Sequence, residues 1–80
     1  MMEVKVLGVG CAKCEKLFEN VKRAAEEVGV EIALEKVTDI SKIMGFGVMI
    51  TPALVVDGEV KAAGKVLSVE QIKELLTKNE

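Results

Sequence analysis

The 80-residue chain contains no histidine, tryptophan or tyrosine, and its aromatic residues are Phe18 and Phe46. Without histidine, the commonest general base is missing, and so are Cys-His and Ser-His nucleophile pairs and mixed Cys/His zinc sites. Eleven basic residues are scattered among thirteen acidic ones, for a net charge of −2. The sequence therefore lacks the basic patch and the stacking aromatics of a nucleic-acid-binding protein, and we expect no nucleic-acid partner.

Long apolar runs are also absent. No uninterrupted apolar stretch approaches the roughly 18 residues that a membrane-spanning helix needs. The segment from Met1 to Leu7 has no basic leader followed by a long apolar run and a small-residue cleavage site, so we expect no signal peptide. These absences predict a cytoplasmic protein that makes no membrane contact.

Cysteine and proline are scarce, with Cys11, Cys14 and Pro52 as the complete set. The two cysteines are too close together to close a stabilising loop. In a cytosolic protein such a pair is more often catalytic, sensory or metal-binding than structural. With no internal repeat, linker or low-complexity tract, residues 1–80 are expected to form a single domain, which is the size that one compact core supports.

The first half of the chain has the pattern of a strand–helix–strand unit. Apolar and charged residues alternate over 3–7 and over 30–37, which predicts two strands. Between them, apolar residues recur every three or four positions over 11–28, which predicts an amphipathic helix that Gly29 ends. Two strands joined by a helix of this length are expected to pair in parallel.

A short second helix is expected next, capped by Thr38 or Asp39 and ended by Gly45. The residues expected to form its apolar stripe are Ile40, Ile43 and Met44. We interpret Met44 and Met49 as fillers of gaps in the core rather than metal ligands, because methionine commonly has this role. Both phenylalanines are likewise interpreted as packing residues.

The second half predicts a hairpin and a final helix. Residues 53–56 are a continuous apolar run, as expected of a strand covered on both faces, and Asp57-Gly58 is a strong signal for a two-residue hairpin turn. Residues 59–62 would be its partner at the sheet edge. A capping-box pattern opens the last helix, over 68–78. The predicted order is β-α-β-α-β-β-α.

The segment Gly10-Cys11-Ala12-Lys13-Cys14 joins the first strand to the first helix. Side chains three residues apart on a helix lie about 5–6 Å from each other, close enough for a disulfide with little backbone movement. At a helix start, unpaired amides and the macrodipole favour an anion, so we expect Cys11 to have the lower pKa, and Lys13 acts in the same direction. Cys14 shares the apolar stripe, so it is expected to be more buried and to react second.

These positions imply a mechanism that needs no cofactor. The Cys11 thiolate attacks a substrate disulfide, and Cys14 then releases the mixed disulfide. The dipeptide Thr51-Pro52 precedes the buried strand and predicts a rigid turn. From this residue alone, a cis peptide bond and a proline that merely begins a strand stay equally open.

The cysteine motif after the first strand, the Thr-Pro that opens a strand hairpin and the final helix together resemble the thioredoxin superfamily. More narrowly, the chain resembles the small redox-active disulfide proteins, which are thioredoxin- and glutaredoxin-like domains of archaea and bacteria. The resemblance covers nearly the whole chain. It implies an α/β thioredoxin-like fold, with a four-stranded mixed sheet and three helices.

The resemblance also implies roles for individual residues. Cys11 would be the attacking thiol and Cys14 the resolving thiol of a protein-disulfide reductase, with no metal at the dithiol. Pro52 would be a cis proline packed beside the disulfide, and the backbone of Thr51 would pair with the substrate chain. The expected partners are disulfide-containing proteins and a dithiol reductase, and the chain is expected to act as a monomer.

The sequence departs from typical members at the motif. Gly10 stands where thioredoxins carry tryptophan, and Ala12-Lys13 replaces their Gly-Pro. Two other functions remain open. A soft-metal chaperone of the ferredoxin-like fold also carries Cys-x-x-Cys after its first strand, and two thiolates are enough to bind Cu(I), whereas zinc would need four ligands and hence two chains. A non-enzymatic adaptor would keep only the binding surface of the fold.

Overall fold

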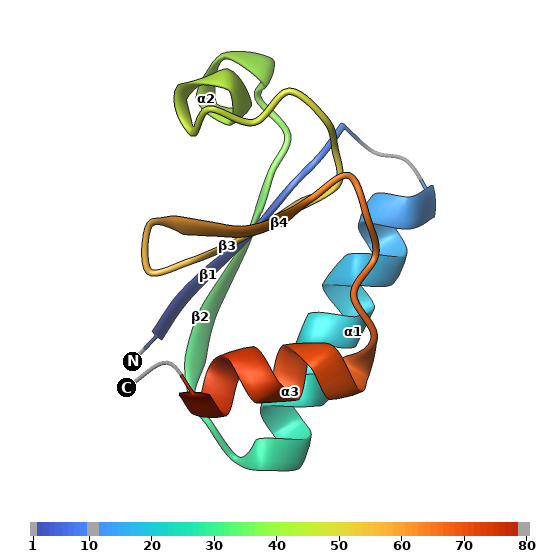
Figure 1. Cartoon of the computed structure of the whole chain (residues 1–80), viewed down its shortest axis with the longest axis vertical. Helices are drawn as coiled ribbons and strands as arrows, with labels where there is room; N and C mark the ends of the chain where they lie inside the picture. The colour runs from blue at the N-terminus through green and yellow to red at the C-terminus, as the bar shows by residue number, and fades with distance from the viewer. Residues whose placement is uncertain (1, 10–11, 79–80) are drawn as a thin grey trace.

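The computed structural model describes residues 2–9 and 12–78. Their elements, in chain order, are β1 (Met2–Leu7), α1 (Ala12–Val28), β2 (Ile32–Val37), α2 (Ile40–Gly45), β3 (Ala53–Val56), β4 (Glu59–Ala63) and α3 (Val69–Lys78) (Figure 1). The predicted order is confirmed, and most element ends agree with the expected ones, the others differing by one or two residues. No helix in the described part of the chain is long and apolar enough to cross a membrane.

The strands form one mixed sheet in the order β2-β1-β3-β4. Strands β1 and β2 are parallel, because α1 carries the chain back along the sheet between them, whereas β3 is antiparallel to both of its neighbours. This is the predicted α/β thioredoxin-like fold. The ferredoxin-like alternative requires a final strand, but the chain ends its described part in α3.

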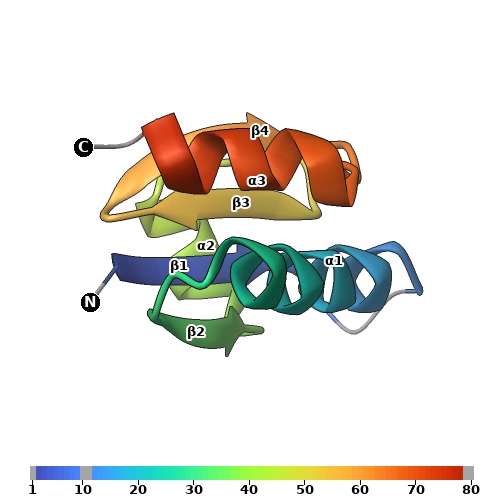
Figure 2. The ribbon, with the colours of Figure 1, turned by 90° about the horizontal axis from the view of Figure 1, so that it is seen from below.

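The helices cover both faces of the sheet unequally. Helices α1 and α3 lie side by side on one face, and α2 lies on the other (Figures 1 and 2). A hydrogen bond from Asn20 Nδ2 to the carbonyl of Leu67, at 2.9 Å, joins α1 to the segment that leads into α3. The two larger helices therefore form one layer, which holds the start of α1 against the sheet.

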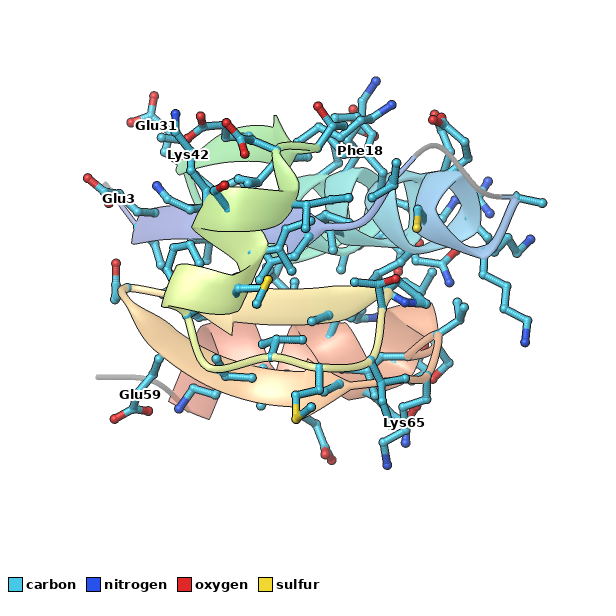
Figure 3. All side chains as sticks on the ribbon, turned by 90° about the horizontal axis from the view of Figure 1, so that it is seen from above. Glu3, Phe18, Glu31, Lys42, Glu59 and Lys65 are labelled. Atoms are coloured by element: carbon cyan, nitrogen blue, oxygen red, sulfur yellow. The ribbon has the colours of Figure 1, made fainter. Side chains whose placement is uncertain are left out.

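Strand β3 is buried on both faces, as its apolar run predicts. Leu54 and Val56 belong to the larger apolar cluster under α1 and α3, whereas Ala53 and Val55 belong to a smaller cluster under α2. Among the described residues, no polar or charged residue is buried. Charged side chains such as Glu31, Lys42 and Lys65 point outward around the sheet (Figure 3).

Local signals in the sequence are confirmed at the element ends. Gly29 follows α1 with a φ of 72°, and Asp57 and Gly58 both have positive φ, which is the conformation of a tight hairpin turn that matches the strand twist. The Asp39 carboxylate accepts a hydrogen bond from the Ser41 amide at 2.9 Å and caps α2. Ser68 and Gln71 exchange the two hydrogen bonds of a capping box.

The predicted apolar stripe of α2 is wrong. Only Ile43 of the three residues is buried, whereas Ile40 is 60% exposed and Met44 is 67% exposed. Met49, interpreted as a core filler, is 98% exposed. A helix of six residues presents little more than one side chain to the sheet below it, so the remaining apolar residues of α2 and the following loop are left on the surface.

Candidate active site

The cysteine motif continues from the segment after β1 into the first turn of α1. Gly10 and Cys11 fall outside the described residues, so the predicted attacking thiol is not placed. Cys14 belongs to the first turn of α1, and its side chain is 2% exposed. The expected burial of Cys14 is confirmed. Its burial follows from its place at the head of the apolar stripe that continues through Leu17 and Val21.

The Cys14 sulfur packs against the backbone at the end of β1. A Cβ atom added at Gly8 would overlap Cys14 Sγ, and it would lie 3.0 Å from Cys14 Cβ and 4.0 Å from Pro52 Cα. The Gly8 amide donates a hydrogen bond to the Val37 carbonyl at 3.0 Å, which ties this backbone to the end of β2. Cys14, Gly8 and Pro52 therefore converge at one point.

Gly8 is a site residue that the sequence analysis did not identify. In the sequence it is one of three residues, Gly8-Val9-Gly10, that separate the first strand from the first helix. The one available signal is a glycine directly after a buried strand and just before a thiol motif, since such glycines often mark a close approach to the backbone. Which atom makes that approach depends on how α1 packs on the sheet.

The Thr51–Pro52 peptide bond is cis, as the resemblance implies. Pro52 is buried, and its carbonyl accepts a hydrogen bond from the Gly64 amide at 2.8 Å, which anchors it to the segment after β4. Thr51 is exposed beside it, and Lys13 is exposed on the first turn of α1. Figure 1 shows the start of α1 and the loop into β3 at the same end of the molecule. The structure thus brings Cys14 and Pro52 together and leaves Thr51 and Lys13 open to solvent.

An apolar groove borders this site. Its volume is about 330 Å³, and we call it the α2 groove; its lining residues are Val9, Ile40, Ile43, Met44, Val48, Met49 and Thr51. Exposed large apolar side chains gathered in one place typically mark a binding surface. The sequence analysis missed this surface because it assigned Met44 and Met49 to the core.

Among residues 2–9 and 12–78, no three histidine, cysteine or acidic side chains are grouped so that they could hold a metal ion. The chemically distinctive feature of the described site is therefore the buried thiol of Cys14 beside a cis proline.

Comparison with known proteins gives a consistent result. The family described as thioredoxin domain matches residues 2–77. A thioredoxin from Methanothermobacter thermautotrophicus is 39% identical over 77 residues, which are 96% of this chain and 100% of that protein. A thioredoxin from Methanocaldococcus jannaschii is 42% identical over 76 residues, which are 95% of this chain and 87% of that protein. The chain therefore belongs to the thioredoxin family of thiol–disulfide oxidoreductases.

Proposed function

We propose that this thioredoxin-like disulfide reductase acts on disulfides of other proteins, with Cys11 as the attacking thiol and Cys14 as the resolving thiol. The observation that carries the proposal is the position of Cys14. Its sulfur lies in the first turn of α1 against Gly8 and beside the cis proline Pro52, three residues after Cys11. This arrangement suits a thiol that receives a disulfide from a neighbouring cysteine.

The proposed reaction consists of two thiol–disulfide exchanges. The Cys11 thiolate attacks one sulfur of the substrate disulfide, forms a mixed disulfide and expels the other substrate sulfur as a thiolate, which takes up a proton. Cys14 loses its proton and attacks Cys11 Sγ, which releases the second substrate thiol. Two electrons pass to the substrate, and the protein is left with a Cys11–Cys14 disulfide. A dithiol reductase restores the dithiol by the reverse exchange.

The order of the two cysteines is supported by burial. At 2% exposure, Cys14 cannot meet a disulfide held in another folded protein, because a direct attack needs an open line to the sulfur. Cys11 precedes α1, whose first amides have no partners within the helix and favour an anion there. Lys13, exposed in the first turn of the helix, adds positive charge near the same point.

Substrate binding is proposed at Thr51 and at the α2 groove. The backbone of Thr51, next to Pro52, would pair with the extended chain around the substrate cysteine. Thr51 also lines the α2 groove, whose exposed apolar residues include Met44 and Met49. An apolar side chain close to the substrate cysteine would fill this groove and remove those residues from water.

We also propose that one chain is the catalytic unit and that it works in the cytoplasm without a cofactor. Both cysteines of the reaction stand in the same motif, so one chain supplies both thiols. A dithiol that must return to its reduced state suits a compartment kept reducing by thiol systems.

Trapping tests the proposal. Cys14→Ser removes the resolving thiol, so disulfide-containing proteins from a cell extract should stay covalently bound to Cys11 and be released by dithiothreitol. The Cys11→Ser variant is the control, since it keeps Cys14 but should trap nothing. Equal trapping by the two variants, or trapping by neither, would exclude the assigned roles.

A further inference from the structure

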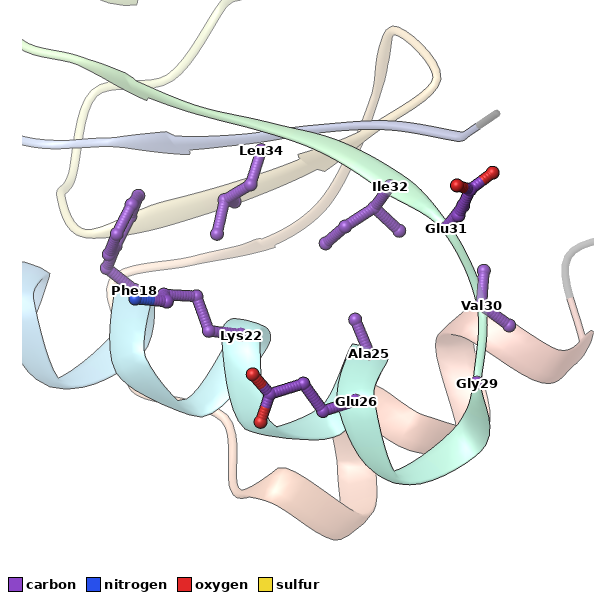
Figure 4. Close-up of a pocket in the computed structure, with 9 residues that line it drawn as sticks. All are labelled: Phe18, Lys22, Ala25, Glu26, Gly29, Val30, Glu31, Ile32 and Leu34. Carbon is purple, nitrogen blue, oxygen red and sulfur yellow. The ribbon is translucent and has the colours of Figure 1, made fainter.

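A second groove lies between α1 and β2, away from the cysteine motif. Its volume is about 580 Å³, and its apolar lining residues are Phe18, Ala25, Val30, Ile32 and Leu34. Figure 4 shows Ile32 and Leu34 extending from β2 toward α1, with Phe18 and Ala25 on the helix. Lys22 and Glu26, one helical turn apart, also line it from α1. We call this feature the β2 groove.

The β2 groove runs along an open edge of the sheet. Within the described residues, β2 pairs with β1 alone, so its other side presents the backbone donors and acceptors of an edge strand. The opposite edge, β4, is protected by charged Glu59 and Lys61 and by an irregularity in its pairing with β3. On β2, the side chains that face α1 are apolar at Ile32 and Leu34, and both are half-buried.

Charged side chains close one end of this edge. Lys36 Nζ lies 4.7 Å from the centre of the Phe18 ring and 2.8 Å from Glu15 Oε2. These contacts cover the end of the groove nearest the start of α1. The uncovered part therefore extends from Val30 to Leu34, along which a second strand could pair and bury apolar side chains.

We propose that a second copy of this chain occupies the β2 groove, with the two β2 strands antiparallel about a two-fold axis. The alignment of the two strands must avoid setting like charges opposite each other. Centring the pair on Ala33 would set Glu31 against Glu35, and centring it on Glu35 would set two carboxylates against each other. Centring it on Ile32 avoids both pairs and keeps the contact within the uncovered part, because Glu31 then faces Ala33 and Val30 faces Leu34.

The charges on α1 favour the same occupant. Because a two-fold axis reverses the order of residues, an axis that passes between Lys22 and Glu26 sets Lys22 of each copy opposite Glu26 of the other. Two complementary ion pairs would then flank the joined apolar side chains. The same surface thus supplies both the apolar strand and the matching charges, which is the property of a self-associating face.

Association in this manner leaves the reductase site uncovered. Glu26 follows Cys14 by twelve residues, which is roughly 18 Å along the helix, and α2 lies on the other face of the sheet. The inference therefore stands apart from the proposed function, and each copy would keep its own dithiol open to substrates.

Sedimentation velocity of the full chain, under reducing conditions, tests the proposal. From about 10 µM to about 1 mM, the mass should rise from one chain toward two, as expected of a small interface. Lys22→Glu and Glu26→Lys each create like-charge pairs across the axis, and each should weaken association about tenfold. Matched charge reversals away from β2, Glu59→Lys on the opposite edge strand β4 and Lys65→Glu in the segment between β4 and α3, should leave association unchanged.

Mixing gives the decisive result. Each single variant alone should remain mostly one chain, but an equimolar mixture of Lys22→Glu and Glu26→Lys should form pairs, because both contacts then join opposite charges. Circular dichroism checks that these exposed substitutions leave the fold intact.

A wild-type chain that keeps a single-chain mass up to about 1 mM, as it would if another protein's strand used this edge, overturns the proposal. So does a mixture that fails to associate. Disulfide reduction per chain should be unchanged in every variant, so a failure here leaves the proposed function unaffected.

Discussion

At Gly8, the missing side chain leaves the space that the Cys14 sulfur occupies. The close approach arises because α1 starts directly over the end of β1, which brings the first turn of the helix onto the strand backbone. Pro52 Cα lies close to the same point. The residue after β1, the residue before β3 and the first turn of α1 therefore meet at one sulfur atom.

Gly8→Ala should displace that sulfur. The added methyl group overlaps Cys14 Sγ, and crowding of this kind in a packed interior costs about 1–3 kcal/mol of unfolding free energy. We also expect slower disulfide reduction, since the second exchange depends on where Cys14 lies. Urea unfolding and the rate of insulin reduction measure the two effects.

Gly45→Ala is the matched control for this change. An added Cβ at Gly45, the last residue of α2, meets nothing within 4 Å. Stability and reduction rate should therefore stay close to those of the wild type. Equal effects of the two substitutions would show that Gly8 has no special relation to the thiol.

Met44 provides a residue-scale test of the α2 groove. It is 67% exposed, so Met44→Gln should leave the free energy of unfolding nearly unchanged. If substrates bury this side chain, the loss of apolar contact should raise KM about tenfold with little change in kcat. Lys42→Gln, on the same helix but outside the α2 groove, should change neither constant. A KM unaffected by Met44→Gln would place substrate binding elsewhere.

At the scale of elements, polar contacts at the surface join helices α1 and α3. Lys73 Nζ lies 3.0 Å from Glu27 Oε1 on α1 and 3.4 Å from Glu70 Oε2 on its own helix. The hydrogen bond with Glu27 raises the pKa of Lys73 above its ordinary value. The protonated form of Lys73 is therefore stabilised in the folded chain.

This shift predicts a pH dependence. Because the pKa of Lys73 is higher in the folded than in the unfolded chain, its contribution to stability is complete below the ordinary value of 10.5 and is lost as pH rises through the folded value. Lys73→Met should thus be slightly less stable than the wild type at neutral pH, and the difference should vanish above the folded pKa. Urea unfolding from pH 7 to about pH 11 measures it.

Lys65→Met is a suitable comparison, since Lys65 is exposed in the segment between β4 and α3. The difference in unfolding free energy between Lys65→Met and the wild type should therefore not change as the pH becomes alkaline. A Lys73→Met difference that persists unchanged at the highest pH would mean that packing of the lysine stem, rather than its charge, joins the two helices.

At the scale of the whole molecule, β3 unites the two apolar clusters. Its alternate side chains face α1 and α3 on one side and α2 on the other, and all four are buried. The strand also begins directly after Pro52, so the packing of the core determines where the proline lies relative to Cys14. Stability and site geometry thus depend on the same strand.

Leu54→Ala should therefore be severely destabilising. Leu54 is fully buried and lies opposite Val6 in the sheet register, so truncation should cost about 2–5 kcal/mol, a large part of the stability of a small domain. Val60→Ala on the edge strand β4, where the side chain is 40% exposed, should cost less than about 1 kcal/mol. Comparable midpoints in urea for the two variants would contradict the central role of β3.

The sequence by itself determined the elements and their order, because those depend on local patterns: the alternation in β1, the periodicity of α1, the turn at Asp57-Gly58 and the cap at Ser68. It also indicated Cys14 as the buried thiol, since that residue stands in the apolar stripe. Only the tertiary structure decided that Gly8 makes room for the Cys14 sulfur and that α2 leaves Met44 and Met49 on the surface. Both depend on how α1 and α2 pack on the sheet, and contacts between a helix and the sheet that it covers leave no periodic trace in the residues that make them.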